Sequence, residues 1–339
     1  MINILRTDRW IHPIFDETLA ENKAVALDIM PLLKADKTKA PQLELADIYL
    51  VPSTRTDIPE RWQVTASLLS ACPRLKVVSS TGSGVDTIDV DACTKAGVLV
   101  VNQAGGNVDS VAEHTMGLLL ALSHRIAEAD RSLRTGPRVS REALMGHEIA
   151  GLTLGLVGMG QVACRVAELA TAFHMKVIAT DPLLRDTTIK ARGAIPVSMG
   201  ELLDASDVIS LHCPHRSATT HLFGDAQFER MKQGSWFLST ARGGIHDEAA
   251  LYRSLLCGHL GGAGLDVWKP EPPPKDHPLL SLPNVVATYH TAGVTHEARK
   301  KMALIAARQI LDICSARRPP RPINPEVWPT VLERLDAQR

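Results

Sequence analysis

Aromatic residues are scarce in this sequence, and neither sign of charge is in excess. Phe, Trp and Tyr make up 4% of the 339 residues, and Lys+Arg and Asp+Glu number 37 each. Without a net field to attract polyanions, the composition argues against nucleic acid and anionic membrane surfaces as partners. A small basic cluster at Arg317, Arg318 and Arg321 is broken by prolines and indicates a solvated segment.

Long apolar runs and paired cysteines are also missing. The longest apolar run, residues 117–122, is far too short to span a bilayer, and residues 1–13 contain charged side chains where a secretory signal has an apolar core. The six cysteines show neither CxxC pairing nor metal-ligand spacing with histidines. The sequence therefore predicts a cytoplasmic protein without disulfides or a metal site.

Short apolar runs alternate with helical stretches along the whole chain, which is long enough for two domains with full cores. This alternation predicts the α/β class, with open, doubly wound parallel sheets and right-handed crossovers. Buried strands are predicted at residues 47–51, 75–79, 97–101, 152–157, 176–180, 208–211, 235–239, 264–267 and 285–288.

Two helices bear on the architecture. The segment 109–128 is apolar on most of its faces, which predicts burial between domains or against a second subunit. Ser110 and Glu113 have the spacing of a capping box at its start. The last helix is expected at residues 296–316, before the proline-rich segment 319–329.

A dinucleotide fingerprint, Gly158-x-Gly160-x-x-Ala163, follows a predicted strand and opens a predicted helix. Gly158 permits a tight turn, Gly160 lets the backbone approach a pyrophosphate, and Ala163 keeps helix and strand close. Such a motif alone could be a plain strand-to-helix turn. Asp181 at the end of the next strand strengthens it, because its carboxylate can bind both ribose hydroxyls and repel a 2′-phosphate. The motif predicts NAD, and the nearby Arg185 leaves use of NADP open.

Three charged residues follow predicted strands in the second half of the chain: Arg242, Glu271 and His290. Taken singly, each would be an ordinary surface or hydrogen-bonded residue. In open α/β sheets, however, ligands bind beyond the carboxyl ends of the strands. A fixed cation and an acid beside a histidine are groups that can move a proton and hold an anionic substrate.

The motifs together resemble those of the D-isomer-specific 2-hydroxyacid dehydrogenases, a family that includes D-3-phosphoglycerate, D-lactate and glyoxylate/hydroxypyruvate enzymes. The resemblance extends over nearly the whole chain. It covers residues 82–86, 100–102, 105–107, 110–115, 158–163, 212–214, 241–244, 265–267, 271–272 and 290–293.

The resemblance implies a role for each member of the trio. Arg242 is expected to bind the substrate carboxylate and polarise the carbonyl oxygen, and His290 to exchange a proton with that oxygen. Glu271 is expected to orient His290 and favour its protonated form. The backbone N–H groups of Ser83 and Gly84 are expected to bind the substrate carboxylate together with Arg242.

The resemblance also implies a set of cofactor contacts, in which Asp266 is the acid on the nicotinamide side. The residues expected to contact NAD are Ser83, Gly158, Gly160, Gln161, Val162, Asp181, Thr219, Thr240, Asp266, His290 and Gly293.

Three positions depart from the family pattern without removing a reacting group. Tyr289 replaces the usual proline before the histidine, Ser239 replaces a common asparagine, and Trp268 replaces a smaller residue. Activity is still expected, with changes in the shape of the pocket and in rate.

By resemblance, the fold comprises two Rossmann-like or flavodoxin-like domains with a deep cleft between them. Residues 1–103 and 294–339 would form a discontinuous substrate domain, and residues 104–293 an NAD-binding Rossmann domain. The cleft would close on substrate and exclude water. A homodimer built on the helix at 109–128 would account for its apolar surface.

The main functional hypothesis is an NAD-dependent oxidoreductase that transfers a hydride between nicotinamide and C2 of a small D-2-hydroxy or 2-oxo acid. One alternative is an NAD-sensing, dimeric binding module like the C-terminal-binding transcriptional corepressors, which share this fold. Another is a family member that uses formate or phosphite as donor. Pro52 stands near a position where phosphoglycerate enzymes commonly have arginine, with Arg55 nearby, so phosphoglycerate stays open as a substrate but is not favoured. The residues do not name the acid.

Overall fold

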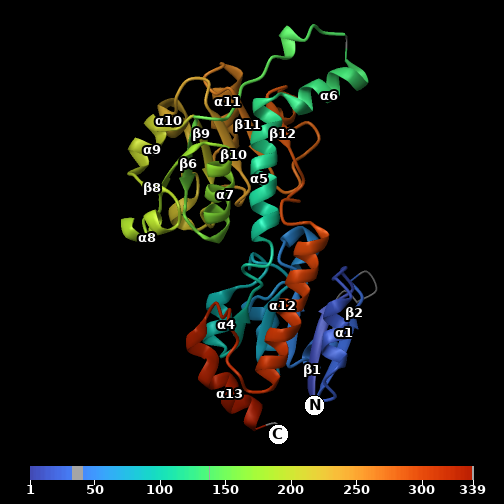
Figure 1. Ribbon diagram of the computed structural model, residues 1–339. Coiled ribbons are helices and arrows are strands. Elements are labelled where there is room, and N and C mark those ends of the chain that lie inside the picture. Colours follow the sequence, from blue (N-terminus) through green and yellow to red (C-terminus); the bar gives the residue numbers. More distant parts are fainter. Residues whose placement is uncertain (33–40, 137, 338–339) are drawn as a thin grey trace. The chain divides into compact units, whose positions relative to one another are not determined.

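The computed structural model describes residues 1–32, 41–136 and 138–337, and the chain divides into two compact units (Figure 1). The first unit comprises Met1–Asn107 and Thr295–Arg339, and the second comprises Val108–Val294. Sequence analysis places the first boundary between the two domains at 103/104, four residues before the boundary at 107/108 in the structure. In the structure, the side chain of Asn107 accepts a 2.9 Å hydrogen bond from Ser83 Oγ, which ties the segment before it to the first unit.

The first unit is built on a five-stranded parallel sheet in the order β2-β1-β3-β4-β5. This is the 2-1-3-4-5 order of flavodoxin-like folds. The sequence analysis does not identify β1 and β2, because polar residues interrupt β1 and β2 is a partly exposed edge strand. The strands are β1 (Ile2–Thr7), β2 (Val25–Met30), β3 (Ile48–Val51), β4 (Val77–Ser80) and β5 (Leu99–Val101).

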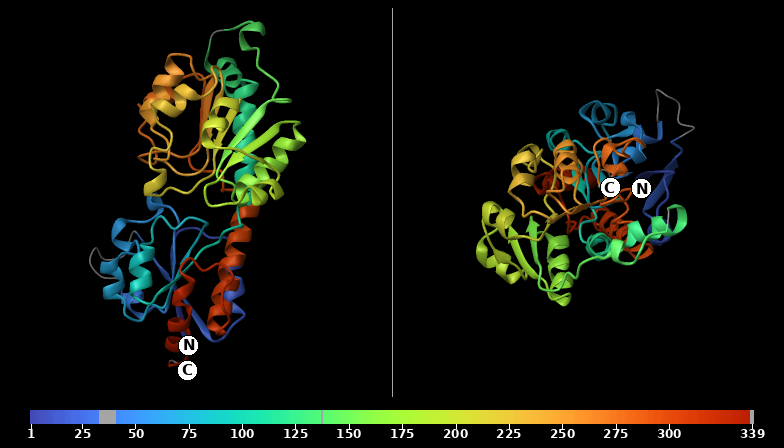
Figure 2. Two further views of the ribbon diagram at one scale, coloured as in Figure 1. Left: turned by 90° about the vertical axis from the view of Figure 1, so that its left-hand side faces the viewer. Right: turned by 90° about the horizontal axis from the view of Figure 1, so that it is seen from above.

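Six helices are described in the first unit, two of them from the end of the chain. The long helix α12 packs beside α1, and both helices share a hydrophobic cluster with strands of the first sheet (Figure 2). The helices are α1 (Ile14–Ala20), α2 (Pro41–Leu45), α3 (Ala66–Ala71), α4 (Val90–Lys95), α12 (His296–Cys314) and α13 (Trp328–Asp336). The expectation that α12 is the last helix is wrong. Pro329 falls in the first turn of α13, where a backbone N–H has no acceptor within the helix, so proline costs no hydrogen bond there.

The second unit is built on a seven-stranded parallel sheet in the order β12-β11-β10-β9-β6-β7-β8. The order reverses on either side of β6, which is the topological switch point of a doubly wound sheet. The strands are β6 (Thr153–Val157), β7 (Lys176–Thr180), β8 (Ile195–Pro196), β9 (Val208–Leu211), β10 (Trp236–Ser239), β11 (Gly262–Leu265) and β12 (Val285–Ala287). The two parallel sheets confirm the predicted α/β class.

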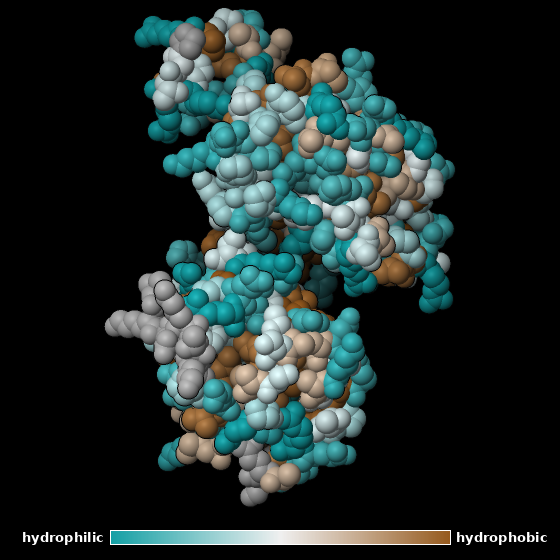
Figure 3. All heavy atoms as spheres, turned by 180° about the vertical axis from the view of Figure 1, so that it is seen from behind, coloured by the Kyte–Doolittle hydropathy of each residue, from teal (hydrophilic) through white to brown (hydrophobic). Residues whose placement is uncertain are grey.

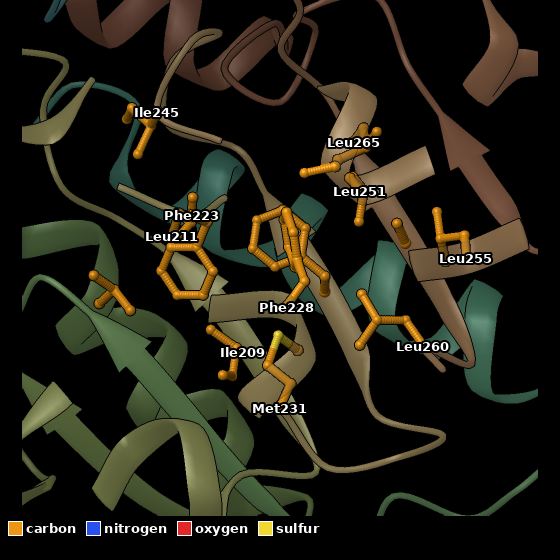
Figure 4. Packing of buried hydrophobic residues seen from close by; sticks show 14 of the residues in the cluster. Ile209, Leu211, Phe223, Phe228, Met231, Ile245, Leu251, Leu255, Leu260 and Leu265 are labelled. Atoms are coloured by element: carbon orange, nitrogen blue, oxygen red, sulfur yellow. The ribbon is translucent and has the colours of Figure 1, made fainter. Parts of the chain in front are cut away.

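Helices cover this sheet, and the side of it shown in Figure 4 is filled by aromatic and aliphatic residues. The rings of Phe228 and Phe237 meet edge to face, with centroids 5.2 Å apart. The helices are α5 (Val108–Ser123), α6 (Ile126–Thr135), α7 (Gln161–Ala172), α8 (Asp186–Ala191), α9 (Met199–Ala205), α10 (Asp225–Arg230) and α11 (Glu248–Leu256).

The apolar helix predicted at 109–128 is shorter than expected and is buried for a different reason. Helix α5 ends at Ser123, because Arg125 has a left-handed backbone (φ 52°) that separates it from α6. Ser110 is buried inside the first turn of α5, so the expected capping box is wrong.

Helix α5 packs on α7 and on β10, β11 and β12 of its own unit. A Cβ atom on Gly264 of β11 would lie 2.9 Å from Leu118 Cβ and 3.4 Å from Leu122 Cδ1, so the helix rests directly on the strand. The apolar surface of α5 is therefore covered within the second unit, and its burial requires neither another domain nor a second subunit.

Hydrophobic residues lie among hydrophilic ones on the face drawn in Figure 3. Among the residues that the structure describes, no helix is long and apolar enough to cross a membrane. In the same described ranges, none of the six cysteines is in a disulfide bond, and no group of His, Cys, Asp and Glu side chains could hold a metal ion.

Candidate functional site: a dinucleotide loop and a charged trio

The glycine loop connects β6 to α7 at the switch point of the second sheet. Gly158 has φ +91°, and a Cβ atom there would lie 2.9 Å from the backbone N of Cys213, in the loop after β9. Both the backbone conformation and the close approach therefore require glycine. A Cβ atom on Gly160 would meet nothing within 4 Å. The space beside Gly160, together with the free N–H groups at the start of α7, fits a pyrophosphate.

Asp181 follows β7 and is tied to this loop. Its Oδ2 accepts a 2.9 Å hydrogen bond from the backbone N–H of Met159, and its Oδ1 accepts one of 3.0 Å from that of Leu183. These bonds hold the half-buried carboxylate beside the glycine turn, where a ribose would follow a bound pyrophosphate. The guanidinium of Arg192 donates to the carbonyl of Met159, a contact that no sequence motif indicates. Arg185 is exposed at the start of α8.

Glu271 and His290 form a direct pair. Glu271 Oε2 lies 2.9 Å from His290 Nδ1, and the two side chains are 23% and 27% exposed. A carboxylate on Nδ1 fixes the orientation of the ring and leaves Nε2 as the nitrogen that can exchange a proton with a substrate. Partial exposure gives a reacting molecule access to the pair.

The turn that carries His290 is held by Asp266. His290 has a left-handed backbone (φ 53°), which a residue with a side chain adopts only when its surroundings compensate. Asp266 Oδ1 accepts hydrogen bonds from Thr291 N (2.8 Å) and Thr288 Oγ1 (2.6 Å), and Oδ2 accepts one from Ala292 N (2.9 Å). The carboxylate of Asp266 is fully buried, and His114 Nε2 on α5 lies 3.7 Å from its Oδ1. Its hydrogen bonds to the backbone of Thr291 and Ala292 stabilise the turn that carries His290.

Trp268 connects the loop of Glu271 to the strand end that precedes His290. Its backbone N–H donates to Glu271 Oε1 (3.2 Å), and its indole N–H donates to the carbonyl of Thr288 (2.9 Å). Its own carbonyl packs so closely on Gly243 that a Cβ atom there could not fit. Sequence analysis treats Trp268 only as a departure from the family pattern, because no spacing indicates these contacts.

Arg242 completes the trio. It follows β10, is half-buried, and donates from Nη1 to its neighbouring carbonyl at Ala241 (2.7 Å). The strands β10, β11 and β12 are adjacent and parallel, so the residues after them emerge at one edge of the sheet. Arg242, Glu271 and His290 therefore belong to the same carboxyl edge as the glycine loop.

The remaining predicted cofactor residues lie in the second unit, apart from Ser83. The buried hydroxyl of Thr240 lies 3.0 Å from that of Thr115 on α5, and Thr219 Oγ1 donates to the carbonyl of Pro214 (2.7 Å). Gln161 and Val162 are the first two residues of α7, and Gly293 closes the turn after His290.

Ser83 and Gly84 lie in the first unit, in the loop after β4. Ser83 Oγ donates to Asn107 Oδ1 (2.9 Å), and the carbonyl of Ser83 accepts from Asn102 Nδ2 (2.7 Å). The hydroxyl of Ser80 donates to the carbonyl of Gly84 (2.5 Å). These bonds hold the loop at the carboxyl edge of the first sheet, where a ligand would bind in such a fold.

Comparison with known proteins shows which family the chain belongs to. Residues 116–292 match the family described as D-isomer specific 2-hydroxyacid dehydrogenase, NAD binding domain. The chain is 38% identical to a glyoxylate reductase of Korarchaeum cryptofilum over 267 residues, 78% of this chain and 80% of the relative. It is 40% identical to a D-3-phosphoglycerate dehydrogenase of Archaeoglobus fulgidus over 272 residues, which are 80% of this chain but only 51% of the relative.

A solved structure extends the similarity to the whole fold. D-lactate dehydrogenase from Aquifex aeolicus, complexed with NAD and lactic acid, is 31% identical and superposes with a TM-score of 0.77, covering 92% of this chain and 96% of that one. The glycine loop, the ribose-side acid and the reversed strand order in Val108–Val294 independently fit NAD. The chain therefore belongs to the family of D-isomer-specific 2-hydroxyacid dehydrogenases, with NAD as its cofactor.

Proposed function

We propose that this chain is an NAD-dependent oxidoreductase that interconverts a small D-2-hydroxy acid and the corresponding 2-oxo acid. The observation that carries the proposal is the Glu271–His290 pair, 2.9 Å apart at the edge of the sheet that holds the dinucleotide loop. The first unit would act as the substrate domain, and the second as the NAD-binding domain. Relatives named glyoxylate reductase and hydroxypyruvate reductase support a small 2-oxo acid as substrate.

In this proposal, each member of the trio has one task. Arg242 binds the substrate carboxylate through its planar guanidinium and draws electron density from the carbonyl oxygen. His290 Nε2 gives a proton to that oxygen during reduction and removes it during oxidation. Glu271, bonded to Nδ1, stabilises the positive ring that exists before the proton is given. Bound NADH supplies the hydride.

The cofactor would lie along the carboxyl edge of the second sheet. Gly158, Gly160, Gln161 and Val162 would hold the pyrophosphate, and Asp181 the adenosine ribose. On the nicotinamide side, the proposed contacts are Ser83, Thr219, Thr240, His290 and Gly293. We assign Asp266 to the same side through a different task, since its buried oxygens fix the turn that presents His290.

The proposal is tested by following loss of NADH absorbance with a panel of 2-oxo acids that includes glyoxylate, pyruvate and hydroxypyruvate. His290→Ala should lower kcat by about 10²- to 10⁴-fold, because it removes the proton donor. His296→Ala is the matched control, since this exposed histidine opens α12 and should leave kcat within about twofold.

The alternatives make different predictions in the same assay. Binding of NADH without turnover of any 2-oxo acid would contradict the proposal and support a corepressor-like binding module. Reduction of NAD by formate or phosphite would instead identify an unusual donor.

We also propose that the chain forms a homodimer, on a different surface from the one expected. Helix α6 protrudes from the second unit (Figure 1), and no residue of α6 is buried. Leu133 and Met145 are 89% and 71% exposed, and α6 borders a groove that includes Val285 and Val286 of the edge strand β12. A second copy would cover these apolar side chains.

Light scattering during size-exclusion chromatography tests the dimer. Leu133→Glu should give monomers, because a carboxylate cannot be buried unpaired in an interface. Leu183→Glu is the control, since Leu183 is 80% exposed elsewhere on the same unit. A monomeric wild-type protein would contradict the proposal.

We further propose a cytoplasmic location. None of the described cysteines is in a disulfide bond, which supports a reducing compartment.

A further inference from the structure

A cavity of about 260 Å³ opens at the carboxyl edge of the first sheet. Its walls come from the ends of β1 and β3, from Thr81 after β4, and from the beginning of α12. The charged residues that line it are Arg6, Arg9, Asp57 and Arg299. Three arginines against one acid make this a cationic cavity, although the chain as a whole carries no net charge.

The three arginines differ in how far the protein already satisfies them. Arg6 is neutralised, because Nε and Nη2 donate to both oxygens of Asp16 (3.0 and 2.7 Å). Arg9 donates from Nε to the backbone carbonyl of Asp57 (2.7 Å). Arg299 is half-buried, and its guanidinium has no hydrogen bond or ion pair within the ranges that the structure describes. Of the three arginines that line the cavity, Arg299 is thus the one without a partner in the described part of the chain.

The position of Arg299 makes this lack of a partner more significant. It lies near the N-terminus of α12, a 19-residue helix that begins at His296. The helix dipole places partial positive charge at that end, so a cation there is disfavoured, and removing part of it from water adds to the cost. An anion in the cavity would compensate the guanidinium and the helix terminus together.

The cavity adjoins the loop expected to bind the substrate carboxylate. Thr81, one of its lining residues, directly precedes Gly82, Ser83 and Gly84. A Cβ atom on Gly82 would lie 2.7 Å from Ser53 Oγ, and Ser53 N donates to Thr81 Oγ1 (3.2 Å). The loop after β3, which carries Ser53, is therefore in contact with the loop after β4. A molecule held at Ser83 and Gly84 therefore has the cationic cavity beside it in the same unit.

We propose that this cavity binds a second anionic group on the substrate, with Arg299 as the main cation and Arg9 as the second. The inference rests on the proposed function, and it names the substrate class: 2-oxo acids that carry a terminal carboxylate or phosphate. A carboxylate and a phosphate each present two oxygens that a guanidinium can bind through two parallel N–H groups. Glyoxylate and pyruvate lack such a group and leave the cavity unused.

Steady-state kinetics with matched substrates test the proposal. Wild-type protein should have a kcat/KM at least tenfold higher for 2-oxoglutarate or 3-phosphohydroxypyruvate than for pyruvate. Whichever of the two is preferred identifies the anion as carboxylate or phosphate. Arg299→Gln should raise KM for the preferred anionic substrate about tenfold or more, with kcat and the KM for pyruvate within twofold. Arg308→Gln, an exposed arginine on the same helix, is the control and should change neither KM.

A binding measurement separates failure of this inference from failure of the proposed function. Inorganic phosphate or malonate should raise the Tm of wild-type protein and of Arg308→Gln, and should raise that of Arg299→Gln much less. Such stabilisation without turnover of any 2-oxo acid would support the cavity and contradict the proposed function. Turnover with no preference for anionic substrates, and equal values in the two variants, would overturn the cavity proposal and leave the proposed function standing.

Discussion

Trp268→Phe is the substitution that most directly tests how the trio is held together. The indole N–H of Trp268 donates to the carbonyl of Thr288, two residues before His290, and its backbone N–H donates to Glu271. Phenylalanine keeps the backbone donor and most of the packing, and removes only the indole N–H and one ring. Trp268 is 3% exposed, so water cannot readily replace the lost donor.

The expected effect on stability has two parts. Leaving the carbonyl of Thr288 without its donor costs about 1–3 kcal/mol. The space left by the smaller ring costs about 1 kcal/mol more. A loss of roughly 2–4 kcal/mol in a unit of this size corresponds to a fall in Tm of roughly 5–15 °C.

The expected effect on catalysis is larger in kcat than in binding. Without the indole contact, the strand end before His290 is no longer tied to the loop of Glu271, and kcat should fall by about 10- to 100-fold. The Kd for NADH and the KM for the 2-oxo acid should stay within about twofold, because the glycine loop and Arg242 are untouched. Kinetics well below the Tm of the variant, with NADH binding measured by fluorescence, give both quantities.

Trp62→Phe provides the matched control. Trp62 is 6% exposed in the first unit, and its indole N–H has no hydrogen-bond partner among the described residues. The change should therefore cost only the cavity contribution of about 1 kcal/mol and leave kcat unaltered. If Trp268→Phe is folded and its kcat lies within twofold of wild type, or if both variants lose kcat equally, Trp268 does not position the pair.

Three further predictions use other features of the second unit. Gly158→Ala should destabilise the fold by at least about 1 kcal/mol, whereas Gly160→Ala should leave stability unchanged and weaken NADH binding about tenfold; thermal melts and NADH titration measure the two effects. Burial lowers the pKa of His246 to about 4, below its usual 6.5, so the unfolded chain takes up the proton first and stability falls as the pH drops from 6.5 towards 4. The loss should be about 2 kcal/mol at pH 5, and urea unfolding of His246→Leu should lack it. Asp181→Asn should reduce the preference for NADH over NADPH, measured as the ratio of kcat/KM values.

Each of these predictions has a contradicting result. Wild-type affinity of Gly160→Ala for NADH would show that the open space beside Gly160 does not serve the cofactor. An acid-stability curve of His246→Leu that coincides with wild type would exclude this buried ring as a cause of acid sensitivity. An unchanged cofactor ratio in Asp181→Asn would remove that carboxylate from cofactor selection.

Local sequence was sufficient where a feature depends on neighbours in the chain. The strand at residues 208–211 is predicted to its last residue, because a buried parallel strand is a short continuous apolar run. The glycine loop was predictable for a similar reason, since Gly158, Gly160 and the helix after them are consecutive. The resemblance carried this further, to the trio and the family.

Features that depend on distant partners were missed or misread. The helix at 109–128 was assigned an external partner, because its periodicity shows apolar faces and cannot show that β10, β11 and β12 cover them. The hydrogen bonds by which Asp266 holds the turn of His290 were missed, because their donors lie more than 20 positions later. The contact of Asp266 with the cofactor stays a prediction. Neither the cover of the helix nor these hydrogen bonds could be found from spacing alone.

The sequence by itself determined the α/β class and the dinucleotide loop, since each depends on short runs of residue types, and the resemblance added the three charged residues as candidates. Only the tertiary structure decided how these residues are held, through the left-handed turn at His290 and the hydrogen bond from Trp268 to Thr288. It also formed the cavity in which Arg299 lies beside residues from the other end of the chain. The reason is physical. Hydrogen bonds and charge compensation depend on positions in space, and those positions follow from how parallel strands are ordered in each sheet.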